Sequence, residues 1–367
     1  MANTEQIGAK PNLVLGLETS CDETAAAIVL RAADGSGRIL SSVVRSQWEK
    51  HRPFGGVVPE IAARAHLECL DVLVREAMRE ANAGFDDLAA VAATSGPGLI
   101  GGLIVGAITC KAIALARGLP FVAVHHLEAH ALTVGLTEGV PPPYLLLLVS
   151  GGHTQLLIVR DVGQYERLGT TIDDALGEAF DKTAKLLGLG FPGGPAVEQA
   201  ARKGNSRRFD LPRPMLGREE PHFSFAGLKT AVRRTAEKLG PLNDQDVADI
   251  AAAFEAAIAD VVADRCARGM ELAVKRLGRL APLRFVVAGG VAANQRLRRS
   301  LGELAQARGF SFHVPPVELC GDNAAMIAWT GAERLARGLV DPLDAPVLPR
   351  WPLDRDAPPA IGAGVKA

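Results

Sequence analysis

The sequence has few cysteines and no excess of charge of either sign. Its five cysteines include no C-x-x-C pair, which argues against a disulfide framework and against a cysteine zinc site. Lys plus Arg number 40 and Asp plus Glu number 41, so a uniformly basic nucleic-acid-binding surface is excluded. Any contact with nucleic acid must therefore use a local basic patch or a partner protein.

Long apolar runs are also absent. The longest, residues 96–110, contains five glycines and a proline and ends at Lys111, short of the roughly 20 residues that a membrane helix needs. The first dozen residues contain no apolar segment of the kind that signal peptides have. We therefore expect a cytoplasmic protein with no membrane span. The 367 residues correspond to about two domains of ordinary size.

Two segments of the chain follow the same plan. Each begins with a predicted hairpin, over residues 13–30 and 144–159, continues to a strand that ends in a glycine turn, and closes with a short strand and a helix. The repeat predicts an α/β fold built by internal duplication, with two lobes and a ligand cleft between them. We assign residues 1–12 to an N-terminal extension, 13–140 to the N-terminal lobe, 141–340 to the C-terminal lobe with an insertion at about 191–246, and 341–367 to a proline-rich tail.

Four glycine-bearing turns follow predicted strands or precede predicted helices, at residues 95–98, 150–153, 192–195 and 289–290. Glycine amides approach a phosphate without a Cβ in the way, although a tight turn in close packing is the more common explanation of any single case. Four such turns in a duplicated fold favour a nucleotide ligand. The sequence G-x-x-x-x-G-K-[ST] does not occur, which excludes a P-loop, and no G-x-G-x-x-G follows the first strand.

His126 and His130 have the i, i+4 spacing that places two side chains on one face of a helix. The pattern resembles half of a zincin motif, but Leu127 stands where a zinc peptidase has its glutamate, so that activity is disfavoured. Asp322 is the candidate third ligand because it opens the equivalent helix of the second repeat. Two histidines and one carboxylate suit Fe(II) or Zn. The alternative is a pair of histidines that cap or pack at a strand–helix junction.

Asp22 and Glu23 lie in the turn of the first hairpin, where a carboxylate has access to a reacting amine or to a phosphate-bound cation. As an alternative, carboxylates in turns are often solvated or capping groups.

The inserted segment carries six basic residues within seventeen positions: Arg202, Lys203, Arg207, Arg208, Arg213 and Arg218. Such a cluster indicates either a surface for a phosphate backbone or an ordinary solvated loop.

Taken together, the motifs resemble the TsaD family of tRNA N6-adenosine threonylcarbamoyltransferases. They include GLETSCDETAAA (16–27), PEIAARAH (59–66), SGPGLIGGLIVG (95–106), HHLEAH (125–130), LVSGGHTQL (148–156), DDALGEAFDKTAKLLGLGFPGGP (173–195), HFSFAGLKT (222–230), AGGVAAN (288–294) and GDNAAMIA (321–328). The resemblance implies an actin-like (ASKHA) duplicated fold. It also implies transfer of a threonylcarbamoyl group from threonylcarbamoyl-adenylate to N6 of the adenosine 3′-adjacent to the anticodon, in tRNAs reading codons that begin with A, with release of AMP.

The resemblance also implies site residues, cofactors and partners. His126, His130 and Asp322 match the metal ligands of the family. The positions that match its adenylate-binding residues are Val149, Ser150, Gly151, Gly152, His153, Asp181, Gly194, Glu198 and Asn294. We expect one divalent metal per subunit, Fe(II) or Zn, and an adenine nucleotide, either threonylcarbamoyl-adenylate or ATP with Mg. The implied partners are tRNA, a TsaB-type paralogue and a TsaE-type ATPase.

Two other functions remain open at this point. One is an actin-like ATPase or kinase that uses Mg and has structural histidines, for which phosphoryl transfer without tRNA is expected. The other is a scaffold subunit that binds nucleotide and partners without turnover. Asp22 and Glu23 are the candidate catalytic residues of the transferase hypothesis, as groups that help remove the proton from the attacking amine.

Overall fold

The computed structural model describes residues 12–278 and 282–358, so most of the expected N-terminal extension and the last nine residues of the tail lie outside it. Contacts within the chain define two compact units. Unit 1 contains the described residues up to His51 together with Val57–Gly139 and Asn323–Trp351. Unit 2 contains Arg52–Gly56, Val140–Asp322 and the described residues from Pro352 onward.

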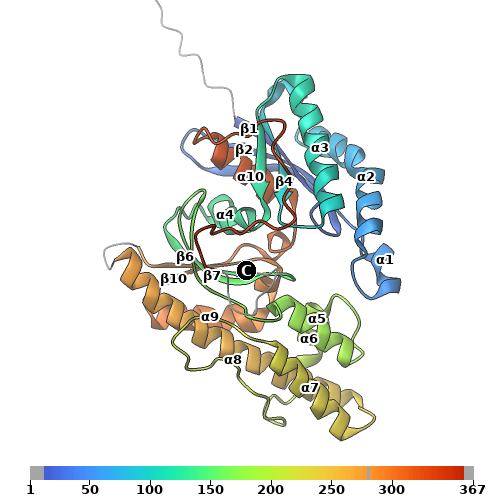
Figure 1. Ribbon diagram of the computed structural model, residues 1–367, viewed down its shortest axis with the longest axis vertical. Helices are drawn as coiled ribbons and strands as arrows, with labels where there is room; N and C mark the ends of the chain where they lie inside the picture. Colours follow the sequence, from blue (N-terminus) through green and yellow to red (C-terminus); the bar gives the residue numbers. More distant parts are fainter. Residues whose placement is uncertain (1–11, 279–281, 359–367) are drawn as a thin grey trace, which may run out of the picture. The chain divides into compact units, whose positions relative to one another are not determined.

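Unit 1 is built on a five-stranded mixed sheet with the strand order β3-β2-β1-β4-β5. Three of these strands, β1, β2 and β4, are labelled in Figure 1. The strands are β1 (Asn12–Glu18), β2 (Glu23–Arg31), β3 (Gly37–Ser46), β4 (Leu88–Gly96) and β5 (Phe121–His125). β1 to β3 form an antiparallel meander, and β4 and β5 continue the sheet in parallel with β1. Parallel pairing needs crossover connections, and the helices between these strands supply them.

Helices cover both faces of this sheet. The helices of unit 1 are α1 (Trp48–His51), α2 (Pro59–Glu80), α3 (Ile100–Arg117), α4 (His126–Glu138) and α10 (Ala324–Leu335), with the short 3-10 turn η2 (Phe85–Asp87). The 3-10 turn η1 (Arg52–Phe54) belongs to unit 2. Leu13, Leu15 and Leu17 of β1 share a core with α2 and α3. On the opposite face, a Cβ on Gly16 would lie 2.4 Å from the backbone nitrogen of Ala328 in α10. β1 is therefore buried on both sides.

The sequence predicted that residues 141–340 form one lobe, but in the structure α10 belongs to unit 1. α10 packs against β1, β2 and β4, so residues 323–351 group with unit 1. α3 is long and apolar enough, by length and composition, to cross a membrane. Its buried residues pack against β4 and α2 within unit 1.

Unit 2 repeats the strand order of unit 1, as β8-β7-β6-β9-β10. Its strands are β6 (Tyr144–Val149), β7 (Thr154–Asp161), β8 (Gln164–Thr170), β9 (Arg284–Ala288) and β10 (Ser311–His313). β6 to β8 are antiparallel, and β9 and β10 extend the sheet in parallel with β6. The internal duplication predicted from the sequence is therefore confirmed at the level of topology.

The helices of unit 2 include the inserted ones. They are α5 (Leu176–Leu186), α6 (Gly193–Ala201), α7 (Ala226–Leu239), α8 (Asp244–Leu277) and α9 (Gln295–Ala307), with the 3-10 turns η3 (Gly290–Ala293) and η4 (Val317–Leu319). α8 begins at a capping box, in which the Asn243 side chain accepts from the Asp246 N–H and the Asp246 side chain accepts from the Asn243 N–H. It packs against the sheet, α6 and α9 and forms the centre of the unit 2 core.

Candidate functional site

The histidines predicted as metal ligands lie where β5 runs directly into α4. His125 is the N-cap of α4, and its Nδ1 accepts from the Leu127 backbone N–H at 3.1 Å. This cap starts the helix at His126, so that His126 and His130 share one face. Their ring centroids lie 4.8 Å apart in an edge-on arrangement, and both side chains are buried.

Asp322 completes the predicted ligand set. It directly precedes Asn323, whose side-chain oxygen accepts from the Met326 N–H at 3.0 Å and so starts α10. One ligand atom each from His126, His130 and Asp322 lies within 4.8 Å of the other two. Two ligands at about 2.1 Å from one ion are at most about 4.2 Å apart, so a small side-chain adjustment suffices. Two imidazoles and one carboxylate are a donor set that fits Fe(II) or Zn.

Behind His126 lies a polar cluster that the sequence analysis missed. The Glu18 side chain is fully buried at the end of β1, and its Oε2 lies 3.1 Å from His126 Nδ1. Thr94 Oγ1 donates to the same oxygen at 2.6 Å, and the Ser20 N–H donates to Oε1 at 2.5 Å. In the sequence, Glu18 is a charged residue at the end of an otherwise apolar strand, which does not distinguish it from a solvated residue of the following turn.

The structure places Asp22 in the turn between β1 and β2, whereas Glu23 is the first residue of β2. The turn is anchored through its backbone. The Asp22 carbonyl accepts from the Gln47 N–H at 2.9 Å, and His66 Nε2 lies 3.1 Å from the Cys21 carbonyl. Burial lowers the pKa of His66 below its usual value, although the Cys21 carbonyl and nearby carboxylates oppose the shift. Ser20 precedes the turn, and its Oγ lies 3.3 Å from His126 Nδ1.

Tight packing requires glycine at some of these turns but not at others. A Cβ on Gly96 would lie 1.9 Å from the Leu348 carbonyl oxygen, and one on Gly98 would lie 2.7 Å from Ser20 Cβ. By contrast, Cβ atoms on Gly151 and Gly152 would meet nothing within 4 Å in the described chain. The same holds for Gly194 and Gly290. Close packing explains the turn at 95–98 but not the open glycines of unit 2.

These open glycines belong to elements that contact one another in a closed ring within unit 2. The Gly177 N–H of α5 donates to the Ser150 carbonyl at 3.2 Å, and Asp181 Oδ1 of α5 accepts from the Gly193 N–H of α6 at 2.8 Å. Glu198 of α6 accepts from the Gln295 N–H at 3.3 Å. η3 closes the ring, because a Cβ on Gly289, the residue before η3, would lie 2.4 Å from the Val149 carbonyl oxygen. The ring connects every substrate-binding position predicted for unit 2.

Both polar atoms of the Asn294 side chain form hydrogen bonds within unit 2. Its Oδ1 caps α9 by accepting from the Leu297 N–H at 2.9 Å, and its Nδ2 donates to Glu255 Oε1 at 2.9 Å. Nδ2 also lies 3.4 Å from Glu198 Oε2. Burial raises the pKa of Glu255, and the Asn294 hydrogen bond opposes that shift. Glu255 is a second residue that the sequence analysis did not identify.

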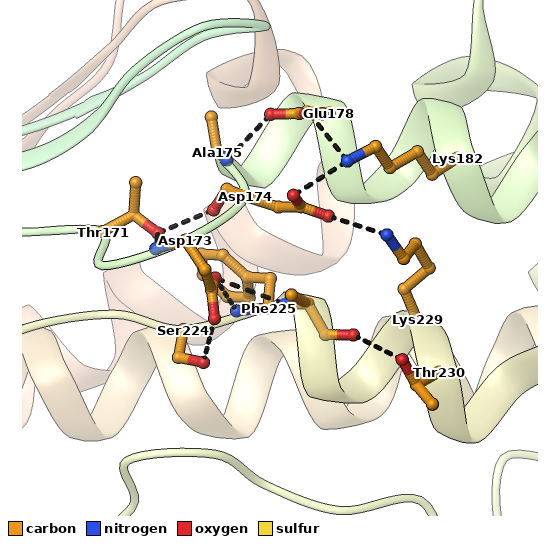
Figure 2. A network of polar contacts seen from close by, with 11 residues as sticks. Thr171, Asp173, Asp174, Ala175, Glu178, Lys182, Ser224, Phe225, Lys229 and Thr230 are labelled. Atoms are coloured by element: carbon orange, nitrogen blue, oxygen red, sulfur yellow. Dashed lines mark hydrogen bonds and ion pairs between the residues drawn. The ribbon is translucent and has the colours of Figure 1, made fainter. Parts of the chain in front are cut away.

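The loop between β8 and α5 holds the 222–230 motif of the inserted segment. Asp173 accepts from the Ser224 hydroxyl at 2.5 Å and from the Phe225 N–H at 2.7 Å, next to the start of α7. Asp174 pairs with Lys182 at 2.8 Å and with Lys229 at 3.5 Å (Figure 2). Desolvation, the largest single influence, lowers the pKa of Lys182, but the Asp174 and Glu178 carboxylates together raise it above its usual value. The network fixes the loop against α7.

Several arginines of the basic insertion are paired with acidic residues. Arg208 contacts Asp246 at 2.7 Å and Asp249 at 2.9 Å, and Arg213 contacts Asp260 at 3.0 Å. The Asn205 N–H and then Arg208 hold the pKa of Asp249 below its usual range. In the part of the chain that the structure describes, the Arg207 side chain forms no ion pair. The insertion is therefore less basic toward solvent than its composition predicts.

Comparison with known proteins identifies the family. Residues 38–329 match the family described as TsaD, tRNA N6-adenosine threonylcarbamoyltransferase. The chain belongs to the TsaD family. A relative of that name from Rhizobium meliloti (strain 1021) is 62% identical over 96% of this chain and 98% of its own length. Another, from Rhodospirillum rubrum, is 62% identical over 97% of this chain and 99% of its own. TsaD proteins are transferases, as expected from the motifs.

Solved structures support the fold. HypF from T. kodakarensis is 17% identical, with a TM-score of 0.60 over 89% of this chain, and this chain spans about half (48%) of its length. A full-length HypF in the phosphate- and nucleotide-bound form is 13% identical, with a TM-score of 0.56 over 89% of this chain and 46% of that one. The predicted actin-like duplicated α/β fold is thereby confirmed.

Proposed function

We propose that this TsaD protein transfers a threonylcarbamoyl group from threonylcarbamoyl-adenylate to N6 of the adenosine 3′-adjacent to the anticodon, in tRNAs reading codons that begin with A, and releases AMP. The observation that carries the proposal is the ring of open glycines in unit 2. Packing does not require glycine at positions 151, 152, 194 and 290, whereas close approach of a phosphate to the backbone does.

The residues of the ring divide among the parts of an adenylate. We assign the phosphate to the turn at residues 149–153, and within it to the amides of Gly151 and Gly152, because the Ser150 and His153 amides donate to the His153 carbonyl and to Ser150 Oγ. The two glycine amides can stabilise the departing AMP. Glu198, with 16% of its side chain exposed, is suited to accept from ribose hydroxyls. Asn294 shapes the pocket through its links to α9 and Glu255. Asp181 holds the start of α6 and so orients Gly194.

We assign a divalent metal, Fe(II) or Zn, to His126, His130 and Asp322. Such an ion supplies Lewis-acid chemistry toward a carbonyl oxygen. Asp22 or Glu23 takes up the proton of the attacking amine, since an exocyclic aromatic amine is a poor nucleophile. The contact between Ser20 and His126 joins the Asp22–Glu23 turn to the metal-binding helix.

We further propose that the protein works in the cytoplasm with a TsaB-type paralogue and a TsaE-type ATPase. α3 exposes Ile100, Ile104 and Ile108 along one stripe, and neighbouring α2 exposes Leu67. Exposed apolar stripes on adjacent helices are typical of protein interfaces. We assign this stripe to the paralogue. Ile104→Asp should abolish co-purification with it, while Leu239→Asp, at the exposed end of α7, should have no effect.

The function is tested by incubating the protein with threonylcarbamoyl-adenylate, unmodified tRNA and both partners, followed by mass spectrometry of the digested tRNA. The modified nucleoside is expected with the native protein. His130→Ala should lose bound metal and activity together, whereas His313→Ala, in β10, should retain both. Absence of product with the full set of components would refute the proposal, and ATP-dependent phosphorylation of a small molecule would favour a kinase.

A further inference from the structure

We propose that Glu18 is a positioning residue that sets the tautomer of His126 and thereby directs the Nε2 atom of that histidine to the metal. The inference rests on the metal site proposed above, and it adds a residue that does not itself touch the metal. Glu18 lies at the end of β1, and none of its surface is exposed.

The hydrogen bonds of the Glu18 carboxylate identify which nitrogen of His126 carries the proton. A buried carboxylate is costly unless donors surround it. Ser20 N–H and Thr94 Oγ1–H are two donors, at 2.5 and 2.6 Å. His126 Nδ1 lies 3.1 Å from Oε2 and 3.3 Å from Ser20 Oγ. A carboxylate oxygen only accepts, whereas a hydroxyl can donate or accept, so this pair of neighbours favours the proton on Nδ1.

The tautomer decides whether His126 can bind a metal. A neutral imidazole carries one proton, so a proton on Nδ1 leaves the lone pair on Nε2 for the ion. Metal-binding histidines commonly donate their second N–H to a carboxylate, which fixes both tautomer and ring orientation. Glu18 supplies this carboxylate from β1, 108 residues earlier in the chain.

A merely structural role for Glu18 makes a different prediction. Glu18→Gln keeps the shape of the side chain, and its amide oxygen can still accept from Ser20. The amide NH₂ then takes the place of Oε2 and faces Nδ1, where it favours the tautomer with the proton on Nε2. If Glu18 only fills space and bonds to the backbone, metal binding should survive this change. If Glu18 positions His126, the Glu18→Gln variant holds the proton on Nε2, the nitrogen that would bind the ion, and metal binding weakens.

The experiment measures zinc binding and histidine tautomers at one fixed pH. The chain is prepared free of metal, with ¹⁵N-labelled histidine, and titrated with Zn²⁺ by calorimetry. Glu18→Gln is expected to raise the dissociation constant 10- to 100-fold, as loss of an outer-shell partner typically does. Thr94→Val keeps the carboxylate and should change it less than threefold. Thermal unfolding of each metal-free variant shows whether it is folded.

Long-range ¹H–¹⁵N spectra of the metal-free chain provide the second readout, with the His126 signals assigned by their loss in His126→Gln. A proton on Nδ1 is expected in the native protein and on Nε2 in Glu18→Gln. An unchanged zinc affinity in a folded Glu18→Gln variant would overturn the proposal, as would Nε2–H in the native chain, which needs no variant to fold. Failure of the native chain to bind zinc or iron would instead refute the metal site.

Discussion

His125 Nε2 lies 2.9 Å from the backbone carbonyl oxygen of Trp351, and the two rings approach to 4.8 Å between centroids. Because His125 also caps α4 through Nδ1, the proline-rich tail is joined to the start of the helix that carries His126 and His130. The Leu348 N–H donates to the Ser95 carbonyl at 2.7 Å, and the Gly98 N–H donates to the Pro349 carbonyl at 3.2 Å. Residues 341–351 are thus an ordered part of unit 1.

The first prediction concerns this tail. Deletion of residues 347–367 removes the bonds of Leu348, Pro349 and Trp351 and should lower the free energy of unfolding by roughly 2–4 kcal/mol, at about 1 kcal/mol per hydrogen bond. Differential scanning calorimetry would measure the loss. Deletion of residues 359–367 removes none of these bonds and should leave Tm unchanged. Equal Tm values for the two truncated chains would contradict a stabilising role for the tail.

The proposed metal-ligand set could be derived from the sequence because its signals are a short helical spacing and the internal repeat. His126 and His130 are four residues apart, and Asp322 was found through the repeat, which topology confirms. Glu18 was not predictable, because its partners Thr94 and His126 lie 76 and 108 residues away in sequence. No local pattern distinguishes such a buried carboxylate from a solvated one beside a turn.

The fold shows the same division between local and distant information. The hairpins β1–β2 and β6–β7 were predicted from apolar runs on both sides of a turn. The third strands, β3 and β8, were missed because β3 is only partly buried and β8 is mostly polar. Both are outer strands of their sheets, where solvent on one side removes the need for apolar residues.

The second prediction compares two glycines. Gly96 has φ +147°, and a Cβ there would collide with the Leu348 carbonyl, so Gly96→Ala should lower Tm by several degrees. Gly151→Ala adds a methyl group to open space and should leave Tm within about 1 °C, because surface changes usually cost less than about 0.5 kcal/mol.

Although Gly151→Ala should leave Tm unchanged, it should weaken the binding of an adenylate. A Cβ at this position stands between the backbone amides and a phosphate, so we expect about tenfold weaker binding of a non-hydrolysable threonylcarbamoyl-adenylate analogue, or about 1.4 kcal/mol. Calorimetric titration would measure it. Native affinity in Gly151→Ala would show that the phosphate does not approach this turn.

The third prediction follows from the lowered pKa of His66. Above pH of about 6.5 His66 is neutral in both the folded and the unfolded chain and contributes no pH dependence. Below that pH the unfolded chain takes up a proton that the buried His66 resists, because burial disfavours the charged form. Stability attributable to His66 is therefore present above its unfolded pKa and lost as the pH falls toward its folded pKa.

His66→Gln removes this titrating group and should flatten the fall of stability between pH 6.5 and pH 5, by at most about 1.4 kcal/mol per pH unit. Urea unfolding at several pH values would measure the slope. Thr24→Val removes the hydroxyl that lies 2.8 Å from His66 Nδ1 but keeps the imidazole, so its slope should stay close to the native one. A native slope in His66→Gln would place the pH dependence in other groups.

The last prediction separates structural from tRNA-binding arginines in the insertion. Arg208 pairs with Asp246 and Asp249, so Arg208→Ala leaves two carboxylates without this partner and should lower Tm. Its neighbour Arg207 is exposed, and Arg207→Ala should leave Tm unchanged.

If Arg207 contacts a tRNA phosphate, its loss weakens binding of every tRNA alike. It should also reduce the slope of log affinity against log salt concentration by about 0.7 to 0.9. Filter binding at several salt concentrations would measure that slope, and a native value in Arg207→Ala would remove this position from the tRNA surface.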